Sequence, residues 1–264
     1  HGGPHFLPWH RAYLLDLERQ MQAVDPAVSL HYWRFDEPAP NLLDSGFIGD
    51  TTQVPEPQAG QPVAFPPGHP LAGWITDSPG IDRSAYFDTQ TESAPGRVAI
   101  PFSFPLRSQA ATLALGSTYA QFMVMEGSPH GAAHVSFGGG ISSPDTAPTD
   151  PLFFMLHCNV DRLWALWQWI ENRVDSSPDS YVEQGIDGRR LADTLWPWND
   201  VTTPPRPPFA PRGTIGFTPS DTTPAPGTTP TIESMIDSQG HLTTASRLGF
   251  GYDDVPFESP GGTP

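Results

Sequence analysis

The chain has 264 residues, and its 13 Lys and Arg against 29 Asp and Glu give a formal net charge of −16. A protein this acidic repels nucleic-acid phosphates and anionic membrane surfaces, so we expect neither nucleic acid nor membrane as a partner. The single cysteine, Cys158, excludes an internal disulfide, which leaves a secreted and a cytoplasmic location both open. The 33 prolines and 25 glycines predict long irregular segments around a compact helical centre.

The first predicted helix lies within "HGGPHFLPWHRAYLLDLERQMQAV" (residues 1–24). Pro8 suits a first helical turn, where its missing N–H costs nothing, and His10 falls at the start of the helix. Asp25-Pro26 ends it. The apolar residues that follow Pro8 recur with a helical period, which predicts an amphipathic helix with an apolar stripe. The stripe comprises Trp9, Tyr13, Leu17 and Met21.

Further along the chain, Pro- and Gly-rich residues 36–105 predict long surface loops around short elements. A second helix is expected over 108–126, and a short helical turn at 128–134. The longest helix is expected in "LFFMLHCNVDRLWALWQWIENR" (152–173), which is apolar almost all round and should be buried. Trp164 and Trp167 are therefore expected in the core.

From about residue 174 the composition becomes rich in Thr and Pro. Aromatic residues within this part, Trp196, Trp198, Phe209 and Phe217, argue against full disorder. We therefore expect an extended wrap over the helical body with one or two short strands. The stretch "LGFGYDDVPF" (248–257) is expected to be a docked strand or turn.

His130 and His134 are four residues apart, so on a helix they lie on one face and can converge on one metal ion. The spacing alone is equally compatible with a surface or core pair. Glu126 lies four residues before His130 and would add a carboxylate to the same face.

His157 lies in the middle of the apolar helix, where a lone histidine is usually a core residue with one hydrogen bond. Asp161, one turn later, changes this interpretation, because a carboxylate there can fix an imidazole or pair with Arg11 or Arg162. Together with the His130 pair, His157 would complete a three-histidine metal site.

His1 and His10 are nine residues apart with two prolines between them, so they cannot share a helix face. His1 would approach a metal site from a loop, and His10 from a helix. Neutral imidazoles suit copper and zinc, which is as far as spacing alone leads.

These segments resemble the tyrosinase family, which includes catechol oxidases and molluscan haemocyanins. "HGGPHFLPWHRAYLLDLE" resembles its copper-A segment, and "EGSPHGAAHVSFGGG" followed by "DPLFFMLHCNVDRLWALWQ" resembles its copper-B segment. "LHYWRFD" looks like a variant of a family strand, and "FGYDD" like the tyrosine motif that closes the catalytic domain. The resemblance implies one catalytic domain over residues 1–255 and a C-terminal tail over 256–264.

The resemblance implies a mainly α fold, an antiparallel four-helix bundle that holds two copper ions, with long loops and a few short strands. His130, His134 and His157 would bind copper B, and His1 and His10 would be the second and third ligands of copper A. The first copper-A ligand lies upstream in the family, so we expect a missing N-terminal segment or separate fragment to supply it. His5, or the amine of His1 itself, is the alternative.

The activity implied is oxidation of o-diphenols or o-aminophenols to o-quinones with O2. In the family a glutamate, here Glu126, holds a water with help from an asparagine, whose position is Gly131 here. We therefore expect weak or absent monophenol hydroxylation. Val135 would form an apolar wall of the entrance, and Phe153 would stack on a ligand imidazole or the bound ring. Solvated Glu126 and core-packed Phe153 are the plainer alternatives.

Four rivals stay open on sequence grounds: a full tyrosinase with monophenolase activity, an oxygen carrier, an inactive copper-binding fragment and a zinc hydrolase. The expected partners are a small phenolic substrate and a copper-loading accessory protein.

Overall fold

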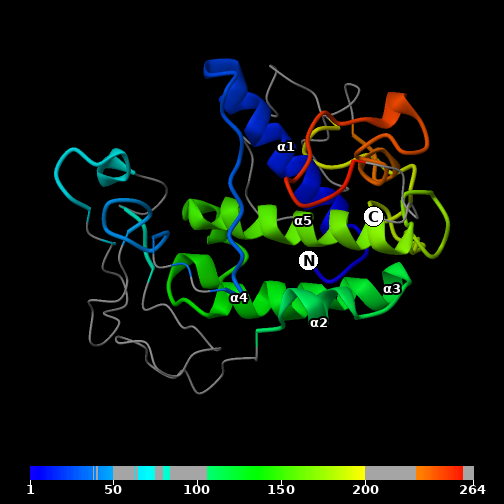
Figure 1. Ribbon diagram of the computed structural model, residues 1–264, viewed down its shortest axis with the longest axis horizontal. Helices are drawn as coiled ribbons and strands as arrows, with labels where there is room; N and C mark the ends of the chain where they lie inside the picture. The colour runs from blue at the N-terminus through cyan, green and yellow to red at the C-terminus, as the bar shows by residue number, and fades with distance from the viewer. Residues whose placement is uncertain are drawn as a thin grey trace. The chain divides into compact units, whose positions relative to one another are not determined.

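The computed structural model describes residues 1–37, 39, 41–49, 63, 65–74, 80–83, 106–199 and 230–257. These residues form two compact units (Figure 1). Unit 1 contains the described residues of His1–Leu30, Ala110–Glu126 and Val160–Pro264, and unit 2 those of His31–Gln109 and Gly127–Asn159. The single domain over 1–255 stays a prediction.

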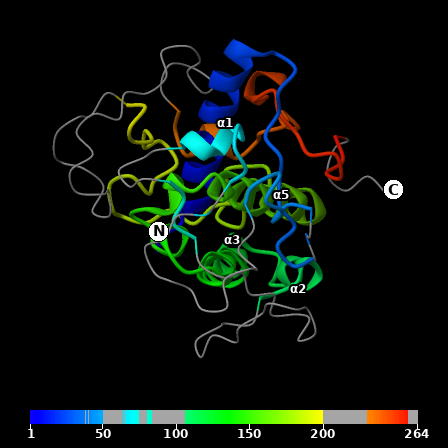
Figure 2. The same cartoon turned by 90° about the vertical axis from the view of Figure 1, so that its left-hand side faces the viewer.

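Helix α1 (Phe6–Val24) carries the N-terminal part of unit 1. It begins four residues before His10, because the Trp9 N–H already donates to the His5 carbonyl, 2.9 Å away. The expected end is confirmed, since Asp25 is extended and its N–H donates to Met21. The 3₁₀ turn η6 (Glu233–Met235) packs beside α1 (Figure 2).

The predicted apolar stripe of α1 is not its most buried part. Its four members are only half-buried, whereas a different face is covered. That face carries a charge, Arg11, at 1 % exposure. Burial of a guanidinium requires a partner, and Asp161 supplies one, so ion pairing rather than apolar periodicity selects the face. The buried positions are Phe6, Leu7, Pro8, His10, Arg11, Ala12, Leu14, Leu15 and Asp16.

The single helix expected over 108–126 is three short pieces: α2 (Gln109–Leu113), α3 (Tyr119–Phe122) and the 3₁₀ turn η2 (Met123–Glu126). Gly116 separates the first two with φ of 140°, a conformation that favours glycine. Thr118 and Gln121 then form a capping box at the start of α3.

Unit 2 contains the π-type turn η3 (Gly127–Gly131), helix α4 (Ala132–Val135) and short 3₁₀ turns. The 3₁₀ turns are η1 (Pro70–Gly73), η4 (Gly140–Ser142) and η5 (Ala147–Thr149). This unit contains a buried ion pair, in which Arg83 donates to both Asp150 oxygens at 2.8 and 2.6 Å. Asp150 also accepts the Leu152 N–H at 2.9 Å, at the start of the longest helix.

That helix, α5 (Leu152–Glu171), agrees closely with the predicted 152–173 segment. Most of its residues are buried, although Ile170 near its end is exposed, and Trp164 and Trp167 are 0 % exposed, which confirms their place in the core. No helix of the described residues is long and apolar enough to cross a membrane.

The mainly helical class is confirmed. In the described part of the chain, β-structure is limited to two isolated bridges, Arg83–Gly139 and Thr194–Thr231, so the expected short strands do not form there. Residues 248–257 contain turns and no strand. Most of the Thr/Pro-rich wrap, including Phe209 and Phe217, lies outside the described residues.

Candidate metal centre

Unit 2 brings three histidines together from η3, α4 and α5: His130, His134 and His157. One ligand nitrogen from each lies within 4.8 Å of the others, and all three residues are buried. The ring centroids are 4.7 to 5.2 Å apart. The three imidazoles are thus positioned to bind one metal ion.

The hydrogen bonds of His134 fit a metal ligand. Its Nδ1 lies 2.8 Å from the Ile141 carbonyl, which can only accept, so Nδ1 carries the proton and Nε2 the lone pair. That Nε2 is 3.1 Å from Nε2 of His157. Two imidazole nitrogens on one tetrahedral ion, each about 2.0–2.1 Å from it, are separated by roughly 3.3 Å. The pair therefore suits a shared metal.

The two histidines of the i, i+4 pair converge, as their spacing had predicted. His130 is in η3 and His134 in α4, and Gly131 between them has helical backbone angles. Ser128, with φ of −148° and ψ of 123°, interrupts the helical backbone before both of them. Because Ser128 lies between Glu126 and His130, Glu126 does not share their helix face.

The other residues predicted around this triad are close to it in the chain. Phe153 packs its ring 4.2 Å from His157 and 6.0 Å from His134. Gly131 is the residue that precedes α4, and Val135 is the last residue of α4 and half-buried. Their parts in substrate binding stay predictions.

In unit 1, the rings of His1 and His10 lie 5.6 Å apart, edge to face. Phe6 lies between them in sequence and contacts both rings, at 5.3 and 4.5 Å. Nδ1 of His10 is 2.8 Å from the Phe6 carbonyl, so this nitrogen donates and Nε2 keeps its lone pair. Both imidazoles can thus offer a nitrogen to a metal.

Glu126 is engaged with the loop that carries His1. Its Oε1 accepts the Gly2 N–H at 2.7 Å and lies 3.2 Å from Nδ1 of His1. The Glu126 side chain is 17 % exposed and that of His1 is 42 % exposed. The carboxylate is therefore held by protein groups rather than solvated at a helix end.

His5 has a different environment from the pair. Burial, together with the positive charge of Arg189, lowers the pKa of its imidazole from 6.5 to about 4. The Nδ1 atom of His5 is buried and has no hydrogen-bond partner. A ligand role for His5 or for the His1 amine stays untested, as does the histidine expected upstream.

Asp161 pairs with Arg11 rather than with an imidazole. Oδ1 accepts from Arg11 Nε at 2.7 Å, and Oδ2 accepts from the Tyr252 hydroxyl at 2.7 Å. The Arg11 guanidinium also lies 3.7 Å from the ring of Trp164. Arg162 pairs with Asp254 instead. The "FGYDD" segment thus contacts two consecutive residues of α5, Asp161 and Arg162.

Sequence reasoning missed the carbonyl groups that orient the imidazoles. Phe6 is four residues before His10, a spacing at which a helical side chain can reach a backbone carbonyl, so it was detectable. The Ile141 carbonyl lies in a loop seven residues after His134, and no motif signals it.

The family model for the common central domain of tyrosinase matches residues 1–170. The chain belongs to the tyrosinase family. It is 30% identical over 224 residues to a tyrosinase of Streptomyces antibioticus, covering 76% of this chain and 75% of the relative. It is 31% identical over 237 residues to grixazone synthase of Streptomyces griseus, covering 76% of each.

Solved structures agree in fold. A functional unit of octopus hemocyanin gives a TM-score of 0.51 at 19% identity, over 97% of this chain. The chain spans about half of that unit, 53%. A tyrosinase from Burkholderia thailandensis gives 0.50 at 20% identity, over 100% of this chain and 62% of the other. As a member of the tyrosinase family the chain is a type-3 copper protein, and the family binds two copper ions.

Proposed function

We propose that this protein is a copper oxidase that converts o-diphenols or o-aminophenols to o-quinones or their imines with O2, and that it hydroxylates monophenols weakly or not at all. Family membership and the buried histidine triad support copper chemistry. The surroundings of Glu126 and the glycine at position 131 support the limit on monophenols.

In this proposal His130, His134 and His157 hold copper B, and His1 and His10 contribute to copper A. The coppers supply the redox chemistry by which O2 is reduced to water while each diphenol gives up two electrons and two protons. The Ile141 and Phe6 carbonyls fix the tautomers of His134 and His10, so that Nε2 of each would keep its lone pair for a metal. Phe153 packs against His157 and limits its rotation.

The observation that carries the proposal is the hydrogen bonding of Glu126. A monophenol must lose its proton before hydroxylation, which needs a base or a base-held water close to the site. One Glu126 oxygen already accepts the Gly2 N–H and lies beside His1. Gly131 offers no side chain to orient a water. A diphenol makes a smaller demand, because its hydroxyls are more acidic and it needs only oxidation.

The experiment compares turnover of catechol, 2-aminophenol and tyrosine by copper-loaded protein. We expect brisk turnover of catechol and a long lag or no turnover with tyrosine. Gly131→Asn should raise the tyrosine-to-catechol ratio about tenfold, which is a small part of what general base catalysis can supply. Gly127→Asn is the matched control, since a side chain there meets open space within the same turn. Fast, lag-free hydroxylation of tyrosine by the wild type would contradict the proposal.

An oxygen carrier is the second candidate, because hemocyanin 2 of Megathura crenulata is 29% identical over 205 residues covering 76% of this chain. Reversible O2 uptake by the copper-loaded protein with no oxidation of catechol would favour that function. Two bound coppers with neither property would identify an inactive copper protein. Hydrolytic activity of the zinc-loaded protein, without catechol oxidation by the copper-loaded protein, would identify a zinc hydrolase.

A further inference from the structure

Residues 1–5, which precede α1, form a loop that hydrogen bonds and packing contacts attach to the rest of unit 1. This loop, His1–His5, is the segment that presents His1. The Gly2 N–H donates to Glu126, as described above. The Pro4 carbonyl accepts a hydrogen bond from the Tyr119 hydroxyl at 2.5 Å. Both partners come from one short segment of unit 1, α3 followed by η2.

Tyr119 is built to hold this bond. The residue is 0 % exposed, and its ring is packed among Tyr181, Trp164 and Trp167, with centroids 5.3 to 6.4 Å away. Its backbone N–H donates to Asp179 at 2.7 Å. Burial raises the pKa of the hydroxyl well above its usual value, so it stays protonated and can only serve the carbonyl as a donor.

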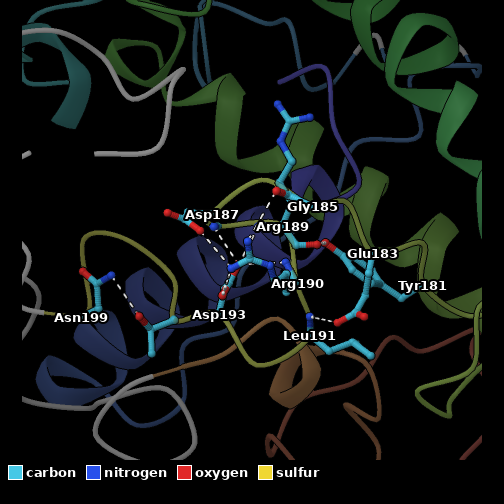
Figure 3. Close-up of polar contacts among 11 residues, drawn as sticks. Tyr181, Glu183, Gly185, Asp187, Arg189, Arg190, Leu191, Asp193 and Asn199 are labelled. Atoms are coloured by element: carbon cyan, nitrogen blue, oxygen red, sulfur yellow. Dashed lines mark hydrogen bonds and ion pairs between the residues drawn. The ribbon is translucent and has the colours of Figure 1, made fainter. Parts of the chain in front are cut away.

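Arg189 also packs against this loop. A Cβ atom added at Gly3 would meet the His5 ring at 2.8 Å and the Arg189 guanidinium carbon at 2.9 Å, so this glycine is packed against both. Figure 3 shows Arg190 facing Asp187, whereas the Arg189 side chain extends away from them. In the same view the Tyr181 hydroxyl donates to the Arg189 carbonyl at 3.0 Å.

We propose that Tyr119 is a positioning residue for copper A, which acts through the Pro4 carbonyl to fix the loop that carries His1. The inference rests on the proposed function, in which His1 is a copper-A ligand. A ligand on a loop has no helix to orient it, unlike His10 on α1. The loop gains that orientation from a buried hydroxyl 115 residues away in the sequence. Tyr119 touches neither metal nor substrate in this role.

The test measures how fast copper leaves the protein. Full-chain wild type, Tyr119→Phe and Tyr252→Phe are loaded with copper and exposed to excess EDTA, and the copper remaining per chain is counted over time. Tyr252→Phe is the matched control, because it removes one tyrosine hydroxyl whose bond, to Asp161 at 2.7 Å, is not to the His1 loop. We expect Tyr119→Phe to release one of two coppers about tenfold faster, the lower end of the effect of outer-shell groups.

The release of the second copper should keep its wild-type rate in Tyr119→Phe, and both rates should be unchanged in Tyr252→Phe. In a His1→Ala background, Tyr119→Phe should add nothing, because the residue that it positions is gone. Gly3→Ala tests the same loop from its other side and should accelerate the same single copper. Unfolding midpoints of the two Tyr→Phe variants should fall by similar amounts, which separates positioning from general stability.

Equal acceleration of both coppers, wild-type release in Tyr119→Phe, or the same acceleration in Tyr252→Phe would overturn the inference. Two coppers in the wild type without catechol oxidation would reject the proposed activity, and the release rates would still decide the role of Tyr119. A wild type that binds only the triad copper would reject the ligand set itself, and the inference with it.

Discussion

The two histidine clusters are built in different ways. In unit 2, the triad is buried, and its rings come from η3, α4 and α5. In unit 1, His10 comes from α1 and His1 from a loop, with 42 % of the His1 side chain exposed. The triad inherits its geometry from neighbouring helical elements, whereas the His1 pair depends on contacts from residues far away in sequence. We therefore expect the triad to tolerate change outside its own residues better than the His1 pair does.

The largest expected effect is the loss of a triad ligand. His157→Ala should abolish catechol turnover and weaken binding of the triad copper, because the ion loses one of its three protein ligands. Copper content by elemental analysis and turnover measure this together. His5→Gln is the comparison variant and should keep both properties. Loss of copper in His5→Gln equal to that in His157→Ala would show that His5 is a ligand.

The second largest expected effect is a loss of stability when the buried ion pair of either unit is broken. Asp161→Ala leaves Arg11 charged and 0 % exposed at its side chain, and Asp150→Ala does the same to Arg83. Breaking such a pair costs about 3–5 kcal/mol. We expect Asp150→Ala to be the more damaging, because Asp150 also accepts the Leu152 N–H at the start of α5. Urea unfolding measures both, and a cost under about 1 kcal/mol at either site would contradict the expectation.

The smallest effect is a pH dependence specific to unit 1. The folded-state pKa of His5 is lowered from 6.5 to about 4, so the unfolded chain binds a proton more readily. The stability that neutral His5 contributes is complete above pH 6.5 and is lost as the pH falls toward 4. We expect wild type to lose about 1–2 kcal/mol more than His5→Gln over this range, a figure reduced for partial exposure.

Urea unfolding at pH 7 and pH 4.5 measures that difference. His31→Gln, a change at an exposed histidine, is the matched control for removing one titrating group. Identical pH dependence in wild type and His5→Gln would show that the imidazole is not protected from protonation in the folded state.

Some of this organisation was predictable from the sequence for local reasons. The triad was predicted because the segments around His130, His134 and His157 resemble the copper-B segment of the tyrosinase family, whereas the spacing of the first two alone left a surface or core pair open. The long apolar helix was predicted correctly because a helix that is buried on most sides carries apolar residues at most positions. The break in 108–126 also carried a signal, the Thr118–Gln121 capping box after Gly116, which the helical composition of its neighbours obscured.

Other features depend on pairing over long distances and have no local signal. Arg11 lies on the buried face of α1 only because Asp161, 150 residues later, neutralises it. Likewise nothing near Pro4 indicates that Tyr119 binds its carbonyl. Such contacts follow from the tertiary fold, which sequence periodicity does not encode.

Helix α5 has a consequence for how the protein opens. The boundary between the units falls after Asn159, so His157 belongs to one unit and Asp161 to the other, one helical turn apart. The backbone bonds of this turn close cooperatively, and a local opening there would release a metal ligand and an ion-pair partner in the same event. Amide hydrogen exchange at residues 157–161 should therefore slow when copper binds the triad, and quicken when Arg11 is replaced.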